Sequence, residues 1–254
     1  MSDTAENFYD QLAEDYHFIF NNWEDSSAFQ GNTINNIILS SLPNSKTLSI
    51  LDCSCGIGTQ SIGLAQKGHH VTATDISLAS VERAIKEANK RGVKISFGIS
   101  DFRTLNKDIK GTYDVVLSAD NSIPHLLTED DLRQTANQLY TKVRPGGMLI
   151  ITMRNYTEIL KEKPASTKPR TFDGGNRIVF QLWDWKEDGR TYTLHHFIMQ
   201  KAKDIWKTKQ YSTSYRAILQ TELTSFLQEA GFRNVSWQSP EESGYYQPVL
   251  LAWK

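Results

Sequence analysis

The sequence has few cysteines, no long apolar run and no surplus of either charge. Its two cysteines, Cys53 and Cys55, are separated by one residue and cannot build a disulfide framework, which favours a reducing compartment. A run of about 18 apolar residues, as a membrane-spanning helix needs, is absent. The 28 lysines and arginines nearly balance the 29 aspartates and glutamates, whereas proteins that bind nucleic-acid phosphates usually have a basic surplus. The start of the chain is acidic and polar, unlike a secretory signal or an arginine-rich transit peptide. We therefore expect a cytoplasmic protein whose partner is a small molecule, not a nucleic acid or a membrane.

Between residues 48 and 153, short apolar segments alternate with segments of helical periodicity. Ser77 and Thr128 precede two of the helical segments and are expected to cap them. This alternation predicts right-handed strand–helix–strand units and a parallel sheet. The strands are expected at 48–52, 70–74, 93–97, 113–118 and 148–153.

After residue 156 the alternation stops, and the pattern changes to that of antiparallel strands. These are expected at 176–185, 191–202 and 206–215, with a hairpin turn at Asp188-Gly189. A helix at 221–230 and apolar segments at 235–237 and 249–253 can complete the parallel sheet, while residues 6–41 have helical spacing. We expect one domain over 1–254, with an N-terminal helical cap at 1–44 and an antiparallel lid at 157–216. The lid should cover the carboxyl edge of the sheet, where α/β proteins bind ligands.

A glycine-rich turn follows the first expected strand. Gly56 and Gly58 are separated by one residue, a spacing that lets the backbone pass close to a ligand. The dinucleotide-binding fingerprint needs a further glycine or alanine where this chain has Ser61. A pyrophosphate site is therefore disfavoured.

Three acidic residues follow three successive strands: Asp52, Asp75 and Asp101. Asp52 beside the turn would repel a pyrophosphate and suit a cationic ligand. Asp75 stands where a carboxylate can hold both hydroxyls of a ribose, and Asp101 stands where it can accept from an adenine amino group. Each acid alone is equally well explained as a turn or capping residue, but the set matches an adenosine that carries a positive charge and no phosphate.

These motifs resemble those of the class I S-adenosylmethionine-dependent methyltransferases. The resemblance spans residues 48–153 and rests on the turn, on the three acids and on Arg144-Pro-Gly-Gly. Residues 113–126 and 144–156 are similar to glycine and sarcosine N-methyltransferases, in particular the Asn121-Ser122 pair, His125-Leu126 and Arg154-Asn155-Tyr156. The implied fold is a Rossmann-like, mainly parallel seven-stranded sheet flanked by helices, with the antiparallel lid inserted after strand five.

The resemblance also implies roles for individual residues. S-adenosylmethionine would be the cofactor, its demethylated form the product, and no metal is needed. Arg154 would bind the substrate carboxylate, Tyr215 would complete the substrate pocket, and Asn121 and His125 are the other candidate catalytic residues. The implied cofactor-binding residues are Tyr16, Trp23, Asp52, Ser54, Gly56, Gly58, Asp75, Ile76, Asp101, Phe102, Ala119, Asp120, Asn121 and Ser122.

Methyl transfer is an in-line displacement on an activated carbon, so positioning can supply about 7–11 kcal/mol and a dedicated base is not mandatory. Asn121 or a backbone carbonyl would orient an amine, and Asp120 or His125 would accept its proton. His125 also has a structural reading, in which it packs and hydrogen-bonds the turn. A guanidinium at a strand end, as in Arg154, can grip a carboxylate in bidentate fashion, although an exposed salt bridge is the simpler reading. Cys53 and Cys55 cannot by themselves complete a four-coordinate zinc site.

Three features depart from the glycine and sarcosine group. Asp120 stands where those enzymes carry glycine, the segment 29–36 has no arginine, and few residues precede Phe8. The predicted function is methylation of the amine of a glycine- or sarcosine-like amino acid. O-methylation of a small-molecule hydroxyl or carboxylate and a non-catalytic cofactor-binding protein are the alternatives. The acceptor, the number of methyl groups and the choice between monomer and homo-oligomer stay open.

Overall fold

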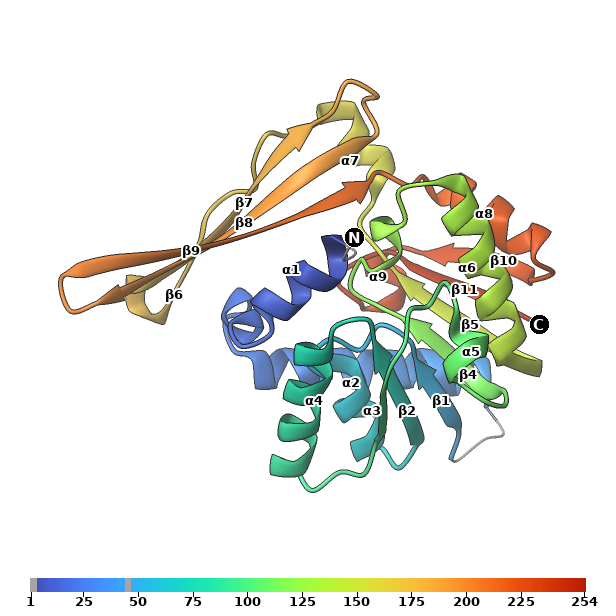
Figure 1. Ribbon diagram of the computed structural model, residues 1–254. Helices are drawn as coiled ribbons and strands as arrows, with labels where there is room; N and C mark the ends of the chain where they lie inside the picture. Colours follow the sequence, from blue (N-terminus) through green and yellow to red (C-terminus); the bar gives the residue numbers. More distant parts are fainter. Residues whose placement is uncertain (1–3, 44–46) are drawn as a thin grey trace.

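The computed structural model describes residues 4–43 and 47–254, and its centre is a seven-stranded sheet (Figure 1). The order is β10-β11-β5-β4-β1-β2-β3, in which the neighbours from β5 to β3 are parallel and β10 and β11 are antiparallel to their neighbours. The strands are β1 (Ser49–Asp52), β2 (His70–Asp75), β3 (Ser96–Ile99), β4 (Tyr113–Ser118), β5 (Val143–Thr152), β10 (Arg233–Gln238) and β11 (Val249–Trp253). This confirms the predicted fold class.

Helices cover both faces of this sheet (Figure 1). One face packs on α2 (Trp23–Ser41), α3 (Thr59–Gln66) and α4 (Leu78–Lys90), around buried Ile34, Ile50 and Leu117. The other packs on α5 (Leu105–Asp108), α6 (Glu129–Lys142) and α8 (Gln220–Glu229), around Leu51, Val116 and Leu149. Successive residues of β1 and β4 therefore serve opposite cores, which explains the uninterrupted apolar runs of these strands.

A second, antiparallel sheet has the order β6-β7-β8-β9 and projects from the first (Figure 1). Its strands are β6 (Arg170–Phe172), β7 (Arg177–Trp185), β8 (Thr191–Ala202) and β9 (Ile205–Arg216). Helix α7 (Tyr156–Glu162) leads into it from β5, and a 3-10 turn, Asp173–Gly175, joins β6 to β7. The long strands β7, β8 and β9 lie close to the predicted segments because the hairpin signal at Asp188-Gly189 is local.

The N-terminal helical segment is less continuous than predicted. Helix α1 (Thr4–Leu12) is followed by a 3-10 turn, Tyr16–Ile19, before α2 begins at Trp23. The Asn22 side chain accepts from the amides of Glu24 and Asp25 and so caps the second helix, whereas the first helix ends before Tyr16, Ile19 and Phe20, which were expected to belong to it. Two further short elements are the 3-10 turn Ile123–His125 and helix α9 (Pro240–Ser243).

The β3 prediction was displaced by two to three residues. The strand was expected at 93–97, and it runs from Ser96 to Ile99. Val93 and Ile95 pack beside Trp23 and Ile57, so their apolar character serves the helix layer and not the sheet ladder.

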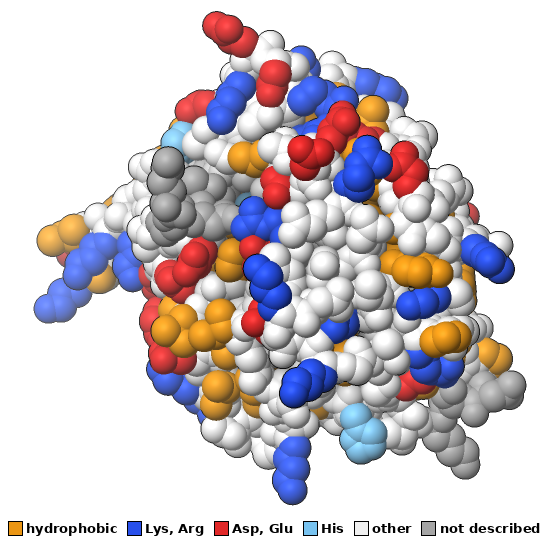
Figure 2. Space-filling model, turned by 45° about the vertical axis from the view of Figure 1, so that its right-hand side comes forward, with side chains coloured by type: hydrophobic (Ala, Val, Ile, Leu, Met, Phe, Trp, Pro, Cys, Tyr) orange, Lys and Arg blue, Asp and Glu red, His pale blue; other side chains and the backbone are white. Residues whose placement is uncertain are grey.

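In the described part of the chain, no helix combines the length and the apolar character needed to cross a bilayer. Figure 2 shows acidic and basic side chains interspersed over the main body of the molecule.

Candidate active site

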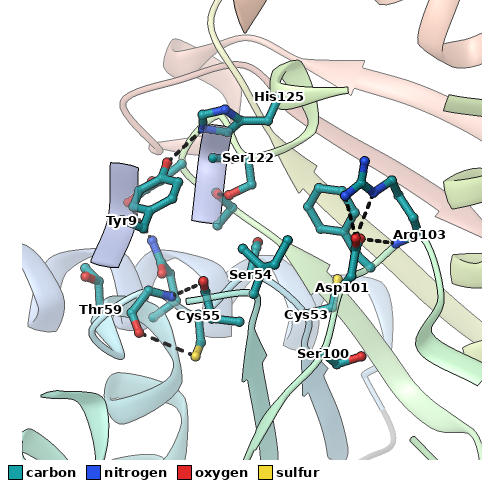
Figure 3. A pocket seen from close by; sticks show the side chains of 18 of the residues that line it. Tyr9, Cys53, Ser54, Cys55, Thr59, Ser100, Asp101, Arg103, Ser122 and His125 are labelled. Carbon is teal, nitrogen blue, oxygen red and sulfur yellow. Dashed lines mark hydrogen bonds and ion pairs between the residues drawn. The ribbon is translucent and has the colours of Figure 1, made fainter. Parts of the chain in front are cut away.

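The carboxyl ends of β1, β2 and β4 open onto a cavity beneath α1 (Figure 3). The turn between β1 and α3 forms its floor, and Gly56 and Gly58 have φ values of 52° and 90°, which favour glycine. A β-carbon on Gly58 would also lie 3.0 Å from Ile62 Cδ1. The lining includes Tyr9, Tyr16, Ser54, Gly56, Asp75, Ile76, Ser100, Asp101, Phe102, Ala119, Asp120, Ser122 and His125.

Asp75 lies in the wall of this cavity and is almost fully buried. One carboxylate oxygen accepts from the Gly56 amide at 2.8 Å, and the other accepts from the Ser77 amide at 3.0 Å. Burial raises the pKa of Asp75, and the two amide hydrogen bonds oppose that shift. Each oxygen keeps a further acceptor site, so the carboxylate suits a pair of hydroxyl groups.

Asp101 is held by its neighbour Arg103 (Figure 3). The Arg103 amide and Nε both donate to the carboxylate at 2.8 Å, and Arg103 Nη2 forms an ion pair with it at 2.6 Å. The Phe102 ring lines the same part of the cavity. A flat apolar surface next to a fixed carboxylate suits an aromatic base that carries an amino group.

Asp52 lies below the turn and does not line the cavity. It is completely buried and accepts from Ser61 Oγ at 2.6 Å and from the Ser54 amide at 3.4 Å. Burial raises its pKa to about 7. Its contacts tie β1 to the first turn of α3, so it supports the glycine-rich turn from beneath.

A second cavity of about 600 Å³ adjoins the first, and Tyr9, Tyr16 and Asp120 line both. It lies between the sheet edge and the antiparallel sheet. Asn121, Arg154 and Tyr215 line this second cavity, which we call the acceptor cavity.

Arg154 extends from the residues that follow β5 to the inner face of the antiparallel sheet. Its Nη1 donates to the Tyr192 hydroxyl at 3.3 Å and its Nη2 donates to Gln181 Oε1 at 3.1 Å. The guanidinium carbon lies 4.9 Å from the Trp183 ring and 5.8 Å from the Tyr215 ring. Among the described residues no carboxylate is within ion-pair distance of Arg154, so its charge is balanced only by neutral groups and π faces.

Asp120 and Asn121 adopt left-handed backbone conformations, with φ values of 56° and 69°. Asn121 Nδ2 donates to the Tyr156 hydroxyl at 3.0 Å, and Asn121 Oδ1 accepts from the Arg154 amide at 3.1 Å. This pair of contacts fixes the turn after β4 against the residues after β5. The conformation is one that Asp and Asn tolerate better than most residues.

The Asp120 carboxylate stands at the junction of the two cavities. It accepts from the hydroxyls of Tyr245 and Tyr246 at 2.7 and 2.6 Å, and from Gln60 Nε2 at 2.7 Å. Burial raises its pKa, and these three donors oppose the shift. In the part of the chain that the structure describes, no cation pairs with it, so the junction suits a positively charged group.

A model of the family described as "Methyltransferase domain" matches residues 50–147. A glycine/sarcosine N-methyltransferase from Halorhodospira halochloris is 33% identical over 165 residues, which is 60% of each chain. An S-adenosylmethionine-dependent methyltransferase structure from Clostridium acetobutylicum superimposes with a TM-score of 0.76 at 16% identity, covering 96% of this chain and 98% of that one. An amino pentose methyltransferase from Micromonospora echinaspora, solved with S-adenosylmethionine, gives 0.69 at 16% identity and covers 94% of both chains.

Residues 50–147 of this chain match a methyltransferase domain, and the chain is similar to S-adenosylmethionine-dependent methyltransferases. The relative from Halorhodospira is matched over three fifths of its length, so its substrates are not carried over by the match alone. The matched residues 50–147 run from β1 into β5 and contain the glycine-rich turn and the three strand-end acids.

The predicted site residues fall into three groups by their place in the structure. Most of the cofactor set and His125 line the first cavity, and Asn121, Arg154 and Tyr215 line the acceptor cavity. Asp52, Gly58 and Trp23 line neither cavity. Trp23 packs behind the turn, where its Nε1 donates to Thr59 Oγ1 at 3.0 Å and Arg91 lies 5.0 Å from its ring.

His125 is held between the N-terminal helix and the antiparallel sheet (Figure 3). Its Nε2 lies 3.1 Å from the Tyr9 hydroxyl, and its ring lies 4.2 Å from the Tyr215 ring. It lines the first cavity and is not among the residues that line the acceptor cavity. These contacts fit the packing interpretation of His125, and its role in proton transfer stays a prediction.

Several cavity residues were not predicted from the sequence. Gln60 is the second residue of α3 and stands two residues after Gly58, so its closeness to the glycine-rich turn was a usable signal. Tyr9, Gln181 and Tyr246 reach the cavities from distant elements, and no local pattern marks them.

The described residues contain no cluster of three or more His, Cys, Asp or Glu side chains that could hold a metal ion. Cys53 and Cys55 are buried, and burial raises the pKa of both thiols.

Proposed function

We propose that this methyltransferase transfers a methyl group from S-adenosylmethionine to the amine of a small, carboxylate-bearing acceptor of the glycine or sarcosine type. The observation that carries the proposal is Arg154, a guanidinium in the acceptor cavity that has no carboxylate partner among the described residues. A planar guanidinium binds a carboxylate in bidentate fashion, and the aromatic rings beside it keep the site poor in water.

The first cavity would hold the cofactor. Asp75 would accept from the two ribose hydroxyls, Asp101 and Phe102 would hold the adenine, and Ser54 and Gly56 would contact the methionine part. Ala119, Asp120 and Ser122 would surround the sulfonium side. When bound, S-adenosylmethionine supplies an already activated methyl carbon.

The acceptor would lie with its carboxylate on Arg154 and its amine toward Asp120. The amine must lose its proton before attack, and the half-buried Asp120 carboxylate, whose pKa is raised by desolvation, accepts it directly or through water. Asn121 and Tyr215 orient the amine, and the antiparallel unit at 157–216 acts as the lid that excludes water. Of the expected N-terminal cap at 1–44, residues 4–43 are described and would cover the cofactor, while residues 1–3 and 44 lie outside the described residues. Positioning supplies most of the rate enhancement.

The test is a labelled-methyl assay with glycine, sarcosine, dimethylglycine, an amino sugar and simple alcohols as acceptors. We expect turnover of the amino acids, and a KM for them that rises about 10- to 100-fold in Arg154→Ala while calorimetry shows unchanged cofactor binding. Arg133→Ala is the control, since Arg133 pairs with Glu229 on α8 and lines neither cavity. Turnover of alcohols alone would favour O-methylation, and cofactor binding without any product would favour a non-catalytic sensor.

A further inference from the structure

A buried histidine of the antiparallel sheet lines the acceptor cavity and has a ring nitrogen with no hydrogen-bond partner in the described part of the chain. His196 lines this cavity and is only 4% exposed. Its Nε2 has no hydrogen-bond partner among the described residues. A buried polar atom left unpaired is costly, and one that lines a binding cavity points to a ligand atom that completes it.

The hydrogen-bond network decides which proton His196 carries. Gln181 Oε1 accepts from Arg154 Nη2 and from Trp183 Nε1, each at 3.1 Å. The Gln181 amide nitrogen is therefore the atom that lies 3.1 Å from His196 Nδ1, and it donates. Since Nδ1 accepts, the proton of the neutral ring is on Nε2, so the atom without a partner is a donor.

Burial, helped by neighbouring cations, keeps this imidazole neutral. Burial, and then the charges of Arg170 and Arg154, lower the pKa of His196 to about 4. Both arginines line the acceptor cavity, and Lys168 joins them at its exposed rim. Arg170 donates to the Ile19 carbonyl at 3.0 Å, and among the described residues neither Arg170 nor Lys168 forms an ion pair. Asp120 is the only carboxylate in the described lining of this cavity, so the lining is net cationic.

We propose that the methyl acceptor carries a second anionic group, which His196 Nε2–H binds within the field of Arg170 and Lys168, so that the substrate class is amino acids with an acidic side chain. This inference rests on the proposed function, in which Arg154 takes the first carboxylate. Two observations favour an acceptor larger than glycine. The cavity measures about 600 Å³, within the range of sites that enclose much larger ligands. Arg154 and His196 are also separated by the Gln181 side chain, which hydrogen-bonds to both and keeps two anion sites apart.

The experiment compares glutamate and aspartate with glycine, and with glutamine and asparagine, whose side chains have the same shape but no charge. For the unaltered protein we expect kcat/KM for an acidic amino acid to exceed that for glycine and for the matching amide by about tenfold or more. In His196→Leu this excess disappears because the KM for the acidic amino acid rises. Its kcat, and both kcat and KM for glycine, stay within about twofold of the unaltered protein. His196→Gln keeps a donor and restores part of the excess, and Arg170→Ala lowers the excess without changing glycine turnover.

His195→Leu is the matched control. His195 is the neighbouring residue, but it lies on the other face of β8, where its Nε2 contacts Asp184 at 2.9 Å and its Nδ1 contacts Ser212 at 2.7 Å. It should leave the acidic preference intact. Calorimetric binding of S-adenosylhomocysteine to each variant shows that the fold is preserved.

The outcomes separate the inference from the function on which it rests. If glycine is methylated as well as the acidic amino acids and His196→Leu changes neither, the inference is wrong and the proposed function stands. If His196→Leu weakens glycine and glutamate equally, His196 serves the first carboxylate and the second anion site does not exist. If no amino acid is methylated, the proposed function fails and the inference fails with it.

Discussion

Gly31 in α2 and Gly63 in α3 touch through their backbones. A β-carbon on Gly31 would lie 2.6 Å from Gly63 Cα, and one on Gly63 would lie 2.8 Å from Gly31 Cα. This close approach brings α2 onto the start of α3, where Ser27 Oγ donates to the Thr59 carbonyl at 2.6 Å. The two glycines thereby allow α3, the helix that follows the glycine-rich turn, to pack closely against α2.

Gly63→Ala is expected to destabilise the protein, although alanine favours helices by about 1 kcal/mol over glycine. The new methyl group meets backbone and not a flexible side chain, so we expect a loss of about 1–3 kcal/mol in the free energy of unfolding measured in urea. Gly98→Ala is the control, because its β-carbon would have a single neighbour at 3.6 Å. A Gly63→Ala protein as stable as the control would show that the helices can separate at no cost.

Asp75→Ala should weaken cofactor binding about 10- to 100-fold, since the acceptor of two hydroxyl groups is lost. Calorimetric titration with S-adenosylhomocysteine measures the effect. Asp114→Asn is the control, because Asp114 pairs with Ser49 and Arg144 at the amino ends of the central strands, away from the cavities. An unchanged dissociation constant for Asp75→Ala would show that this carboxylate does not bind the ribose.

Asp120→Asn should lower the preference for a charged cofactor. The carboxylate at the junction of the cavities favours a sulfonium over a neutral thioether, and asparagine keeps the shape and tolerates the φ of 56°. We expect the ratio of the dissociation constants of S-adenosylhomocysteine and S-adenosylmethionine to fall about fivefold, a change of about 1 kcal/mol. A ratio equal to that of the unaltered protein would place the sulfonium elsewhere.

The contacts of the Glu87 carboxylate lead us to expect that the stability of the protein depends on pH. Its carboxylate accepts from Arg83 Nε at 2.8 Å, Lys90 Nζ at 2.9 Å and Arg91 Nη1 at 2.7 Å. Burial alone would raise its pKa, but the three cations lower it to about 2, from an ordinary value near 4.5. A lowered pKa in the folded state stabilises the protein above the ordinary value, and this contribution is lost as the pH falls toward 2.

Glu87→Gln should therefore reduce the free energy of unfolding by roughly 2–3 kcal/mol at pH 7, and by progressively less below pH 4.5. Urea titrations at pH 7 and pH 3 measure this difference. Glu82→Gln, at an exposed position of the same helix, should change little at either pH. An equal loss for Glu87→Gln at both values would mean that packing and not charge is responsible.

The sequence predicted those parts of the fold that local signals determine. Ser77 caps α4 by accepting from the Ser80 amide, and Thr128 caps α6 by accepting from the Asp131 amide, as their positions before helical segments indicated. The strands alternate with helices because each βα unit carries its own apolar run and turn chemistry.

Side-chain directions, and contacts between residues that are distant in the chain, could not be predicted from the sequence. Asp52 ends a strand as Asp75 does, but Asp52 is directed beneath the turn onto Ser61, and only the packed structure decides this. Gln181 and His196 meet through strand register across β7 and β8, a relation that no motif encodes. Asp52 and Asp75 therefore occupy equivalent positions in the sequence pattern, but only Asp75 lines the cavity in the structure.

The position of β11 has a consequence for synthesis. Its buried residues pair with β5 on one side and β10 on the other, for example Leu250 with Ile151 and Trp237. During translation, β5 is made about a hundred residues before this partner, so its apolar border stays unpaired until residues 249–253 have left the ribosome. The yield of correctly folded protein in a cell should therefore depend on how well that open border is shielded from other nascent chains, and not only on the stability of the finished fold.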